Sequence, residues 1–252
     1  MPISAANAQA IESIKAAGRI IMEIFQRIDK MDLRRMKTID LNDRIDTMIR
    51  ENAASPAFLN YRGFPKSCCI SLNEEVVHGI PDSRRIEDGD IVKIDVGVNY
   101  RGYIADAART FAAGSIAPEA QQMLEVTKQA LKKGIAAAKP GNKISDISRA
   151  IQTTVEAKGY SVVRELTGHG IGRNLHEEPA IPNFVGSGPE FLIKPGMALA
   201  IEPMVNMGKH DVVTAQNRWT ILTKDNSLSC HYEDTVLIVD DGNLNLTKTM
   251  EN

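Results

Sequence analysis

The chain has 252 residues, enough for one large domain or two small ones with a sizeable apolar core. Its 30 basic and 32 acidic residues leave a net charge of -2, which gives no sign of a nucleic-acid-binding or membrane-binding surface. The three cysteines do not make a disulfide framework, and the sequence shows neither a secretory signal nor an apolar run of about 20 residues. We therefore expect a soluble, cytoplasmic protein with reduced thiols.

The first half of the chain is predicted to form two helices followed by strands. Apolar residues at three- and four-residue steps predict an amphipathic helix over 7–28 and a second helix over about 40–53. Short extended runs then predict strands, with turns at the Asp-Gly pair 88–89 and the Arg-Gly pair 101–102. These runs lie at 67–72, 74–80, 90–100 and 102–114.

The same order of elements begins again after Pro118. One helix is predicted from Pro118 to about residue 138 and another over about 144–158, with Gly159 as its C-terminal cap. Strand-like runs follow at 197–206, 218–225 and 232–240, whereas the segment 172–196 is expected to be irregular and to border a cleft. The repetition predicts two α+β halves around one mixed or antiparallel sheet, with no linker between them. We therefore expect a single domain over residues 1–252.

Four acidic residues and one histidine carry the main chemical signal. Several of these acids lie in or beside apolar runs typical of strands, where an unpaired carboxylate is costly to bury. A group of them in one place needs cations, so the pattern favours a pair of divalent metals and metal-assisted hydrolysis. Hard oxygen ligands with one imidazole suit Mn, Fe(II), Co or Mg, and there is no CxxC pair for structural zinc. The five residues are Asp95, Asp106, His169, Glu202 and Glu233.

The spacing of these residues predicts a site shared by the two halves. Asp95 and Asp106 are eleven residues apart across the turn at 101–102, so two paired strands would bring them together. The other three residues belong to the second half. Each residue alone has a plainer interpretation, because an aspartate after a strand is usually a turn or cap residue and a histidine in a glycine-rich loop is usually structural. The combination carries the argument.

The strings around these residues are recognisable as a set. NEEVVHGIPD, KIDVGVNYRGYIADAARTF, GHGIGRNLHEEP, IEPMV and YEDT occur in this order, and together they resemble the bacterial form of the type I methionine aminopeptidases. The resemblance covers nearly the whole chain. It implies the pita-bread (creatinase/aminopeptidase) fold, with pseudo-twofold αα-β halves around a curved, mostly antiparallel sheet. It also implies removal of the initiator methionine from nascent polypeptides whose second residue is small, by metal-activated water attack on the first peptide bond.

The resemblance also implies a role for each of the five residues. Asp95 would bind one metal as a bidentate ligand, and Asp106 and Glu233 would bridge both metals. His169 and Glu202 would complete the shell of the other metal, with Glu202 as the proton shuttle. The implied cofactors are two divalent ions, with Co, Mn, Fe(II), Zn and Ni as candidates.

Three further sets of residues follow from the resemblance. His78 and His176 would position the substrate and stabilise the intermediate. The methionine side chain would occupy an apolar pocket, although ordinary core packing stays an alternative interpretation for Trp219; the pocket residues are Tyr61, Phe64, Cys69, Met204 and Trp219. A monovalent cation, Na or K, would bind backbone groups near Asn73, Glu75 and Ser229.

The chain departs from the family's pattern at three positions beside the site. Leu175 stands where phenylalanine is usual, Ala107 where threonine is usual, and His231 where glutamine is usual. None of the three is an expected metal ligand, so the departures bear on affinity, metal occupancy and rate.

Two other functions fit the same motifs. An Xaa-Pro aminopeptidase or prolidase usually carries an added N-terminal domain, which 252 residues do not hold. A non-catalytic binding module of this fold typically loses metal ligands, and all five are kept here. As partners, the resemblance implies the N-terminal methionine of nascent peptides and names the ribosome as a candidate. It favours a monomer, and the sequence shows no nucleic-acid-binding motif and no membrane segment.

Overall fold

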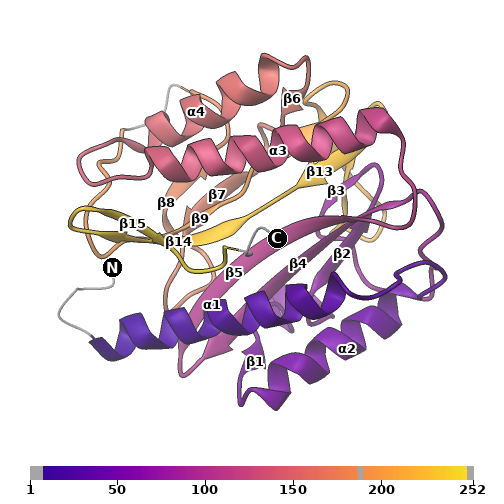
Figure 1. Cartoon of the computed structure of the whole chain (residues 1–252), viewed down its shortest axis with the longest axis horizontal. Helices are drawn as coiled ribbons and strands as arrows, with labels where there is room; N and C mark the ends of the chain where they lie inside the picture. Colours follow the sequence, from indigo (N-terminus) through magenta and orange to yellow (C-terminus); the bar gives the residue numbers. More distant parts are fainter. Residues whose placement is uncertain (1–7, 187–189, 249–252) are drawn as a thin grey trace.

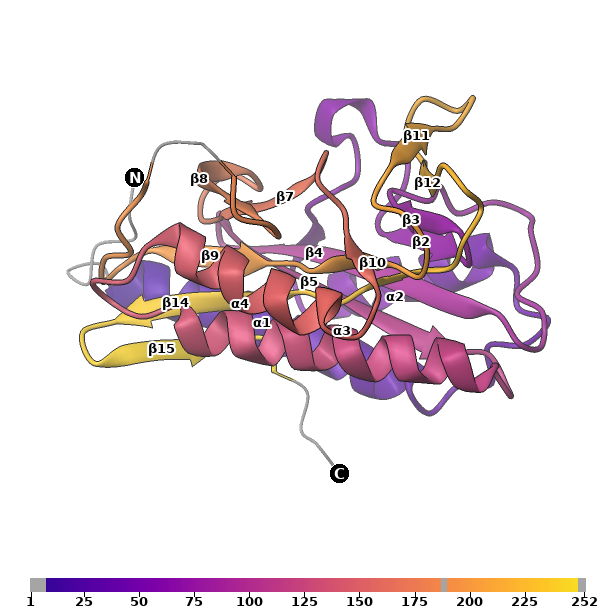
Figure 2. The ribbon, with the colours of Figure 1, turned by 90° about the horizontal axis from the view of Figure 1, so that it is seen from above.

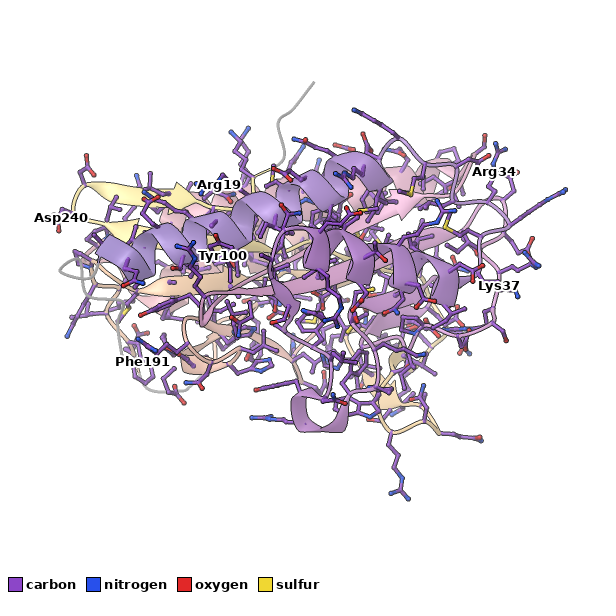
Figure 3. All side chains as sticks on the ribbon, turned by 90° about the horizontal axis from the view of Figure 1, so that it is seen from below. Arg19, Arg34, Lys37, Tyr100, Phe191 and Asp240 are labelled. Atoms are coloured by element: carbon purple, nitrogen blue, oxygen red, sulfur yellow. The ribbon has the colours of Figure 1, made fainter. Side chains whose placement is uncertain are left out.

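A computed structural model describes residues 8–186 and 190–248. Its first two helices are α1 (Ala8–Ile28) and α2 (Thr38–Glu51), close to the predicted ranges; residue 7, the first of the predicted helix 7–28, lies outside the described residues. The inner face of α1 is apolar because isoleucines recur at helical spacing, and Ile14, Ile21 and Ile24 are almost fully buried. Figure 3 shows α1 and α2 lying across the strands, with Arg19 of α1 at the surface.

The predicted strand pair around Asp95 and Asp106 is an antiparallel hairpin. Strands β4 (Ile91–Tyr100) and β5 (Tyr103–Ala112) are joined at Arg101 and Gly102, whose φ angles of 51° and 82° suit a two-residue hairpin turn. The register places Asp95 opposite Ala108 and Asp106 opposite Gly97. Because side chains alternate along a strand, both aspartates point to the same face of the hairpin. Strands β1 (Ser55–Pro56) and β2 (Cys69–Leu72) also pair with β4.

The second helix pair also follows the prediction. Helix α3 spans Pro118–Ala137 and α4 spans Ile144–Glu156. Pro118 begins α3, where its missing N–H costs no hydrogen bond, and the Asp146 carboxylate accepts the Lys143 N–H at the start of α4. Gly159, with a φ of 80°, follows the end of α4 as expected for a C-terminal cap.

The strands of residues 8–186 and 190–248 form four hydrogen-bonded sheets, whereas the sequence pattern predicted one. The chain leaves its ladder at Glu202-Pro203, because Pro203 has no N–H to donate, and again at Tyr232-Glu233. Glu233 and Ala108 nevertheless exchange backbone hydrogen bonds of 3.0 and 3.3 Å, which join the two halves at the hairpin. The ladders among the described residues are antiparallel. The remaining strands are β3 (Glu75–Val77), β6 (Ser161–Val162), β7 (Thr167–Gly170), β8 (Glu177–Pro182), β9 (Ala198–Ile201), β10 (Met204–Asn206), β11 (Val212–Thr214), β12 (Ile221–Thr223), β13 (Ser229–His231), β14 (Asp234–Val239) and β15 (Gly242–Asn245).

The expectation that 172–196 is irregular was wrong for β8. This strand pairs with β7 at the edge of the sheet ordered β15-β14-β9-β7-β8. Proline is tolerated in an edge strand, so Pro179 and Pro182 obscured the strand pattern without preventing the pairing. Residues 187–189 of the segment lie outside the described residues.

The helices and strands form layers that leave one side of the strands open to loops. Figure 1 shows α1 and α2 on one side of the strands and α3 and α4 on the other. Each helix pair covers its own apolar cluster, one around Phe25 and Ile94 and the other around Ile151 and Leu199. Figure 2 shows β7, β8, β11 and β12 standing out on the side away from α3. In the part of the chain described here, no helix is both long and apolar enough to cross a membrane.

Candidate metal centre and peptide site

The five predicted residues meet where strands of the two halves come together. Asp95 and Asp106 lie on β4 and β5, and His169 lies on β7. Glu202 lies between β9 and β10, and Glu233 lies between β13 and β14. One side-chain ligand atom from each of Asp106, His169 and Glu233 lies within 4.8 Å of the other two, and all three residues are buried. We call the five residues together the acidic cluster.

His169 and Glu202 face each other within the acidic cluster. The Glu202 Oε1 atom lies 3.6 Å from His169 Nε2. His169 Nδ1 lies 2.9 Å from the Gly170 carbonyl oxygen, which can only accept, so Nδ1 carries the proton and Nε2 presents its lone pair to the cluster. Burial, followed by the neighbouring His176, lowers the pKa of His169 to about 3. The imidazole is therefore neutral near pH 7, which is the form that binds metals.

The carboxyl groups of the acidic cluster have raised pKa values, because they are buried and negative charges held close together repel. Burial raises the pKa of Asp106 to about 7. Burial also raises the pKa values of Asp95, Glu202 and Glu233 well above the usual range, and the charge of Asp106 adds to each of these shifts. Divalent cations would reverse this balance, because a cation stabilises the ionised form of each ligand.

Three buried carboxylate oxygens of the acidic cluster indicate whether it can bind cations. Asp95 Oδ1, Asp106 Oδ1 and Glu233 Oε1 are buried and have no hydrogen-bond partner among the residues that the structure describes. Buried carboxylate oxygens without donors are unfavourable unless a cation is bound to them. The donor set of four carboxylates and one neutral imidazole therefore fits divalent metals that accept hard oxygen ligands.

Two residues that the sequence analysis missed hold the backbone of the acidic cluster in place. Thr235 Oγ1 accepts the Asp106 N–H at 2.9 Å and donates to the Asp106 carbonyl at 2.7 Å. Arg109, only 7% exposed, donates to the Glu233 carbonyl and to Asp234 Oδ1, the latter at 2.6 Å. An arginine inside a strand run needs a buried acceptor, so the string ADAART was the signal that could have found this contact.

Two of the expected substrate-side residues line the edge of the acidic cluster. The ring of His176 lies 4.3 Å from that of His169, between centroids, and its Nδ1 atom lies 2.7 Å from the Tyr61 hydroxyl. His176 is exposed, whereas His78 is half-buried, with a positive φ of 59°. Burial, followed by the neighbouring His176, lowers the pKa of His78 to about 4, so His78 is also neutral near pH 7.

Four of the five expected pocket residues belong to the large apolar cluster around α1 and α2: Tyr61, Phe64, Cys69 and Trp219. Within it, the Phe64 and Trp219 rings meet edge to face, with centroids 5.2 Å apart. Cys69 pairs with Asp95 across β2 and β4, which places this cluster beside the acidic residues. Met204 is fully buried in a different apolar cluster, with Val76, Val77 and Val163.

The residues expected around a monovalent cation surround a lysine that the sequence analysis did not single out. The carbonyls of Asn73 and Ser229 both accept a hydrogen bond from Lys93 Nζ, at 2.6 and 3.0 Å. The Glu75 carboxylate accepts from the Leu72 N–H at 2.8 Å and from the Arg84 guanidinium.

The three departures from the family pattern are all buried. Ala107 and Leu175 are 0% and 3% exposed and belong to the cluster around α1. His231 is 1% exposed, and its Nε2 atom lies 3.6 Å from Glu202 Oε2. Of the three, His231 is therefore placed to act on the acidic cluster.

The acidic cluster is a buried group of metal-ligating side chains at the junction of two α+β halves. Such a cluster defines the chain as a metal-dependent hydrolase. The family model described as "Metallopeptidase family M24" matches residues 12–240. A methionine aminopeptidase of Clostridium acetobutylicum is 46% identical over 239 residues, which cover 94% of this chain and 95% of that protein. Methionine aminopeptidase 1 of Bacillus subtilis is 44% identical, with 91% and 92% covered. The chain belongs to metallopeptidase family M24 and, within it, to the methionine aminopeptidases.

Solved structures agree on the fold. The crystal structure of methionine aminopeptidase from Thermotoga maritima superposes with a TM-score of 0.94 at 38% identity, covering 98% of this chain and all of that chain. Prolidase from Pyrococcus furiosus superposes with a TM-score of 0.79 at 26% identity, and the match covers 97% of this chain but 65% of the prolidase. The predicted pita-bread fold is confirmed, and the longer prolidase agrees with the added domain expected of that class.

Proposed function

We propose that this chain removes the N-terminal methionine from polypeptides whose second residue is small. The observation that carries the proposal is the position of the acidic cluster beside part of the large apolar cluster around α1 and α2, where Cys69 pairs with Asp95 and the Phe64 ring packs against Trp219. The first provides ligands for hydrolytic metals, and the second provides a surface for a thioether side chain. Membership in the methionine aminopeptidases supports the same activity.

Two divalent ions are the proposed cofactors, held by Asp95, Asp106, His169, Glu202 and Glu233. Co, Mn, Fe(II), Zn and Ni are the candidate metals, because the ligand set excludes none of them. When bound, such ions supply a water of lowered pKa and polarise the carbonyl of the first peptide bond. Asp106 and Glu233, which the family resemblance assigns to both metals, would be the shared ligands, and their ligand atoms lie within 4.8 Å of each other.

Glu202 is the proposed proton shuttle. Its side chain is 12% exposed, so its carboxylate is less deeply buried than those of Asp106 and Glu233. His169 and His231 lie on either side of its carboxylate, each at 3.6 Å. Burial raises the pKa of Glu202, which favours its holding a proton before passing it to the leaving amine.

His78 and His176 are the proposed substrate-positioning residues. His176 lies over His169, and its Nδ1 contact with Tyr61 leaves Nε2 available to the substrate. His78 follows β3, and the Thr220 hydroxyl donates to its carbonyl at 3.3 Å. Neutral histidines on this side can donate a hydrogen bond to a developing oxyanion without repelling the cations below.

The methionine side chain is proposed to bind among Tyr61, Phe64, Cys69 and Trp219, with Met204 lending support from the neighbouring cluster. Sulfur packs well against aromatic rings, and such a pocket discriminates against one missing methylene by only about 1–3 kcal/mol. We expect norleucine to replace methionine with a modest loss of rate.

The remaining proposals concern cellular setting. We infer a single catalytic domain over residues 1–252, acting in the cytoplasm as a monomer on nascent peptides, with the ribosome as a candidate partner.

A peptide panel tests the activity. Metal-stripped protein is titrated with Mn, Fe(II), Co, Ni and Zn, and hydrolysis is measured on Met-Ala-Ser, Met-Leu-Ser, Leu-Ala-Ser, acetyl-Met-Ala-Ser and Ala-Pro. Cleavage of Met-Ala-Ser alone is expected. Comparable cleavage of the acetylated or leucine-initiated peptide would refute amine recognition and methionine choice. Cleavage of Ala-Pro instead would favour a prolidase activity.

A further inference from the structure

Lys93 is a fully buried cation at the junction of the two halves. It lies on β4, two residues before Asp95, and is 1% exposed. Its Nζ atom donates to the Asn73 carbonyl at 2.6 Å and to the Ser229 carbonyl at 3.0 Å. Asn73 belongs to the turn between β2 and β3, and Ser229 begins β13, so one ammonium group joins a turn of the first half to a strand of the second.

The acceptors around Lys93 are of the kind that bind a monovalent cation. Both are backbone carbonyl oxygens, the ligands with which proteins replace the hydration shell of K⁺. The nearby carboxylates are engaged elsewhere: Glu75 with the Leu72 N–H and Arg84, and Asp90 with the Asn73 amide and the Glu87 N–H. Both contacts need an N–H donor, and the lysine ammonium group supplies three.

Lys93 and one of the residues it contacts, Ser229, are each close in sequence to a residue of the acidic cluster. Lys93 and Asp95 point to the same face of β4, because they are two residues apart on one strand. Ser229 begins the strand whose chain continues through His231 to Glu233. The Ser229 N–H also donates to the Asn73 carbonyl at 3.0 Å, so the ammonium and this backbone bond close the same junction.

We propose that the ε-ammonium of Lys93 is a tethered substitute for a monovalent cation, and that Lys93 is a positioning residue of the site. It fixes β13, and with it Glu233, against the strand that carries Asp95, without touching the substrate. This replaces the expectation of a free Na⁺ or K⁺ near Asn73, Glu75 and Ser229. The chain therefore needs no added monovalent ion.

Two variants separate charge from packing. Lys93→Ala opens a space beside the two carbonyls that K⁺ or NH₄⁺ can enter, whereas Lys93→Met fills it with an uncharged side chain of similar length. Met-Ala-Ser hydrolysis and the melting temperature of the metal-stripped protein are each measured in choline chloride, KCl and NH₄Cl at equal ionic strength. Exposed Lys158 provides the control variant Lys158→Ala.

The parent and Lys158→Ala should show the same rate and melting temperature in all three salts. In choline chloride, Lys93→Ala should lose about tenfold in rate and melt at a lower temperature, because a charge-assisted contact is lost. KCl or NH₄Cl should restore both quantities saturably in Lys93→Ala and neither in Lys93→Met. If a variant folds poorly, the yield of folded protein in KCl against choline chloride gives the same comparison.

Three results would overturn the proposal. A saturable effect of K⁺ on the parent would mean that a free ion is bound after all. Parent-like behaviour of Lys93→Ala in choline chloride would mean that the charge is not needed. If KCl or NH₄Cl restored the rate and melting temperature equally in both variants, or in neither, Lys93 would contribute only packing. The rate measurement rests on the proposed function, but the melting temperature does not, so failure of one is distinguishable from failure of the other.

Discussion

The acidic cluster and the residues above it are held by the fold in different ways. The acids lie on paired strands or at strand ends, and three of the five residues of the cluster are at most 7% exposed. The residues above it, which we call the rim, lie outside the strands, with Tyr61 in the short 3₁₀ helix Tyr61–Gly63 and the others on loops. All four are half-buried or exposed: Tyr61, His78, His176 and Trp219. Strands fix the cluster before any ligand arrives, whereas loops leave the rim able to adjust to a peptide.

The two regions also differ in electrostatics. In the acidic cluster, burial and mutual repulsion raise carboxyl pKa values, so the site favours cations. On the rim, burial lowers the pKa of His78 and His176, so both imidazoles stay neutral above the cluster. A substrate therefore meets charge at the floor of the site and neutral hydrogen-bonding groups above it. Variants in the two regions should fail in different ways.

The largest effect is expected from His169→Ala in the acidic cluster. Losing the imidazole removes one ligand and leaves the carboxylates with an incomplete cation shell, so activity should fall by about 10³-fold or more. Metal content by mass spectrometry should fall with it, while circular dichroism stays close to the parent. His210→Ala, which removes a half-buried imidazole from outside the cluster, is the control. Near-parent turnover by His169→Ala would show that His169 holds no metal.

A rim variant should lose rate and keep its metals. For His176→Ala we expect kcat to fall by about 10²-fold with a smaller change in KM, because a hydrogen bond to the reacting centre is lost. Tyr61→Phe removes only the 2.7 Å contact that orients His176, and should cost about tenfold or less. Loss of metal from His176→Ala would move His176 from the rim into the cluster.

A variant of Arg109 tests how much the ion pair beside the acidic cluster stabilises the protein. Arg109→Met leaves Asp234 buried without its ion-pair partner, so the free energy of unfolding should fall by about 3–5 kcal/mol. Urea unfolding of the metal-free protein measures it, with Arg19→Met at an exposed position of α1 as the control. Adding Asp234→Asn to Arg109→Met should recover part of the loss, because the unpaired charge is then gone. A loss below 1 kcal/mol would mean that the ion pair carries little of the stability.

Features with local signals were predicted well from the sequence. Helical periodicity located α1 and α3, and the Arg-Gly turn located the hairpin that brings Asp95 and Asp106 to one face. The acidic cluster was predictable because burying five ligating groups demands a cation, whatever the surrounding fold. Roles for individual residues came from the resemblance.

Features that depend on distant partners were missed. Arg109 bonds Asp234, 125 residues away, and Lys93 bonds Ser229, 136 residues away, and no periodicity encodes such pairs. Strand β8 was missed because its prolines imitate a loop while β7 supplies the pairing. Met204 was grouped with the other pocket residues by motif alone, and its place in a separate cluster is set by packing.

His231→Gln should give the smallest effect, because it restores the family's usual residue beneath the acidic cluster. Burial lowers the pKa of His231 to about 3, so the ring is neutral at working pH and contributes polarity to Glu202 without charge. Glutamine also carries a neutral donor, and kcat/KM for Met-Ala-Ser should stay within about threefold of the parent. His231→Leu removes the polar contact while keeping the bulk, so it should cost about tenfold and shift the acid limb of the pH–rate profile that reports Glu202. If His231→Gln and His231→Leu lower the rate equally, the site requires the shape of the imidazole ring. If His231→Leu matches the parent in rate and pH profile, His231 does not act on Glu202, and the departure from the family has no effect on activity.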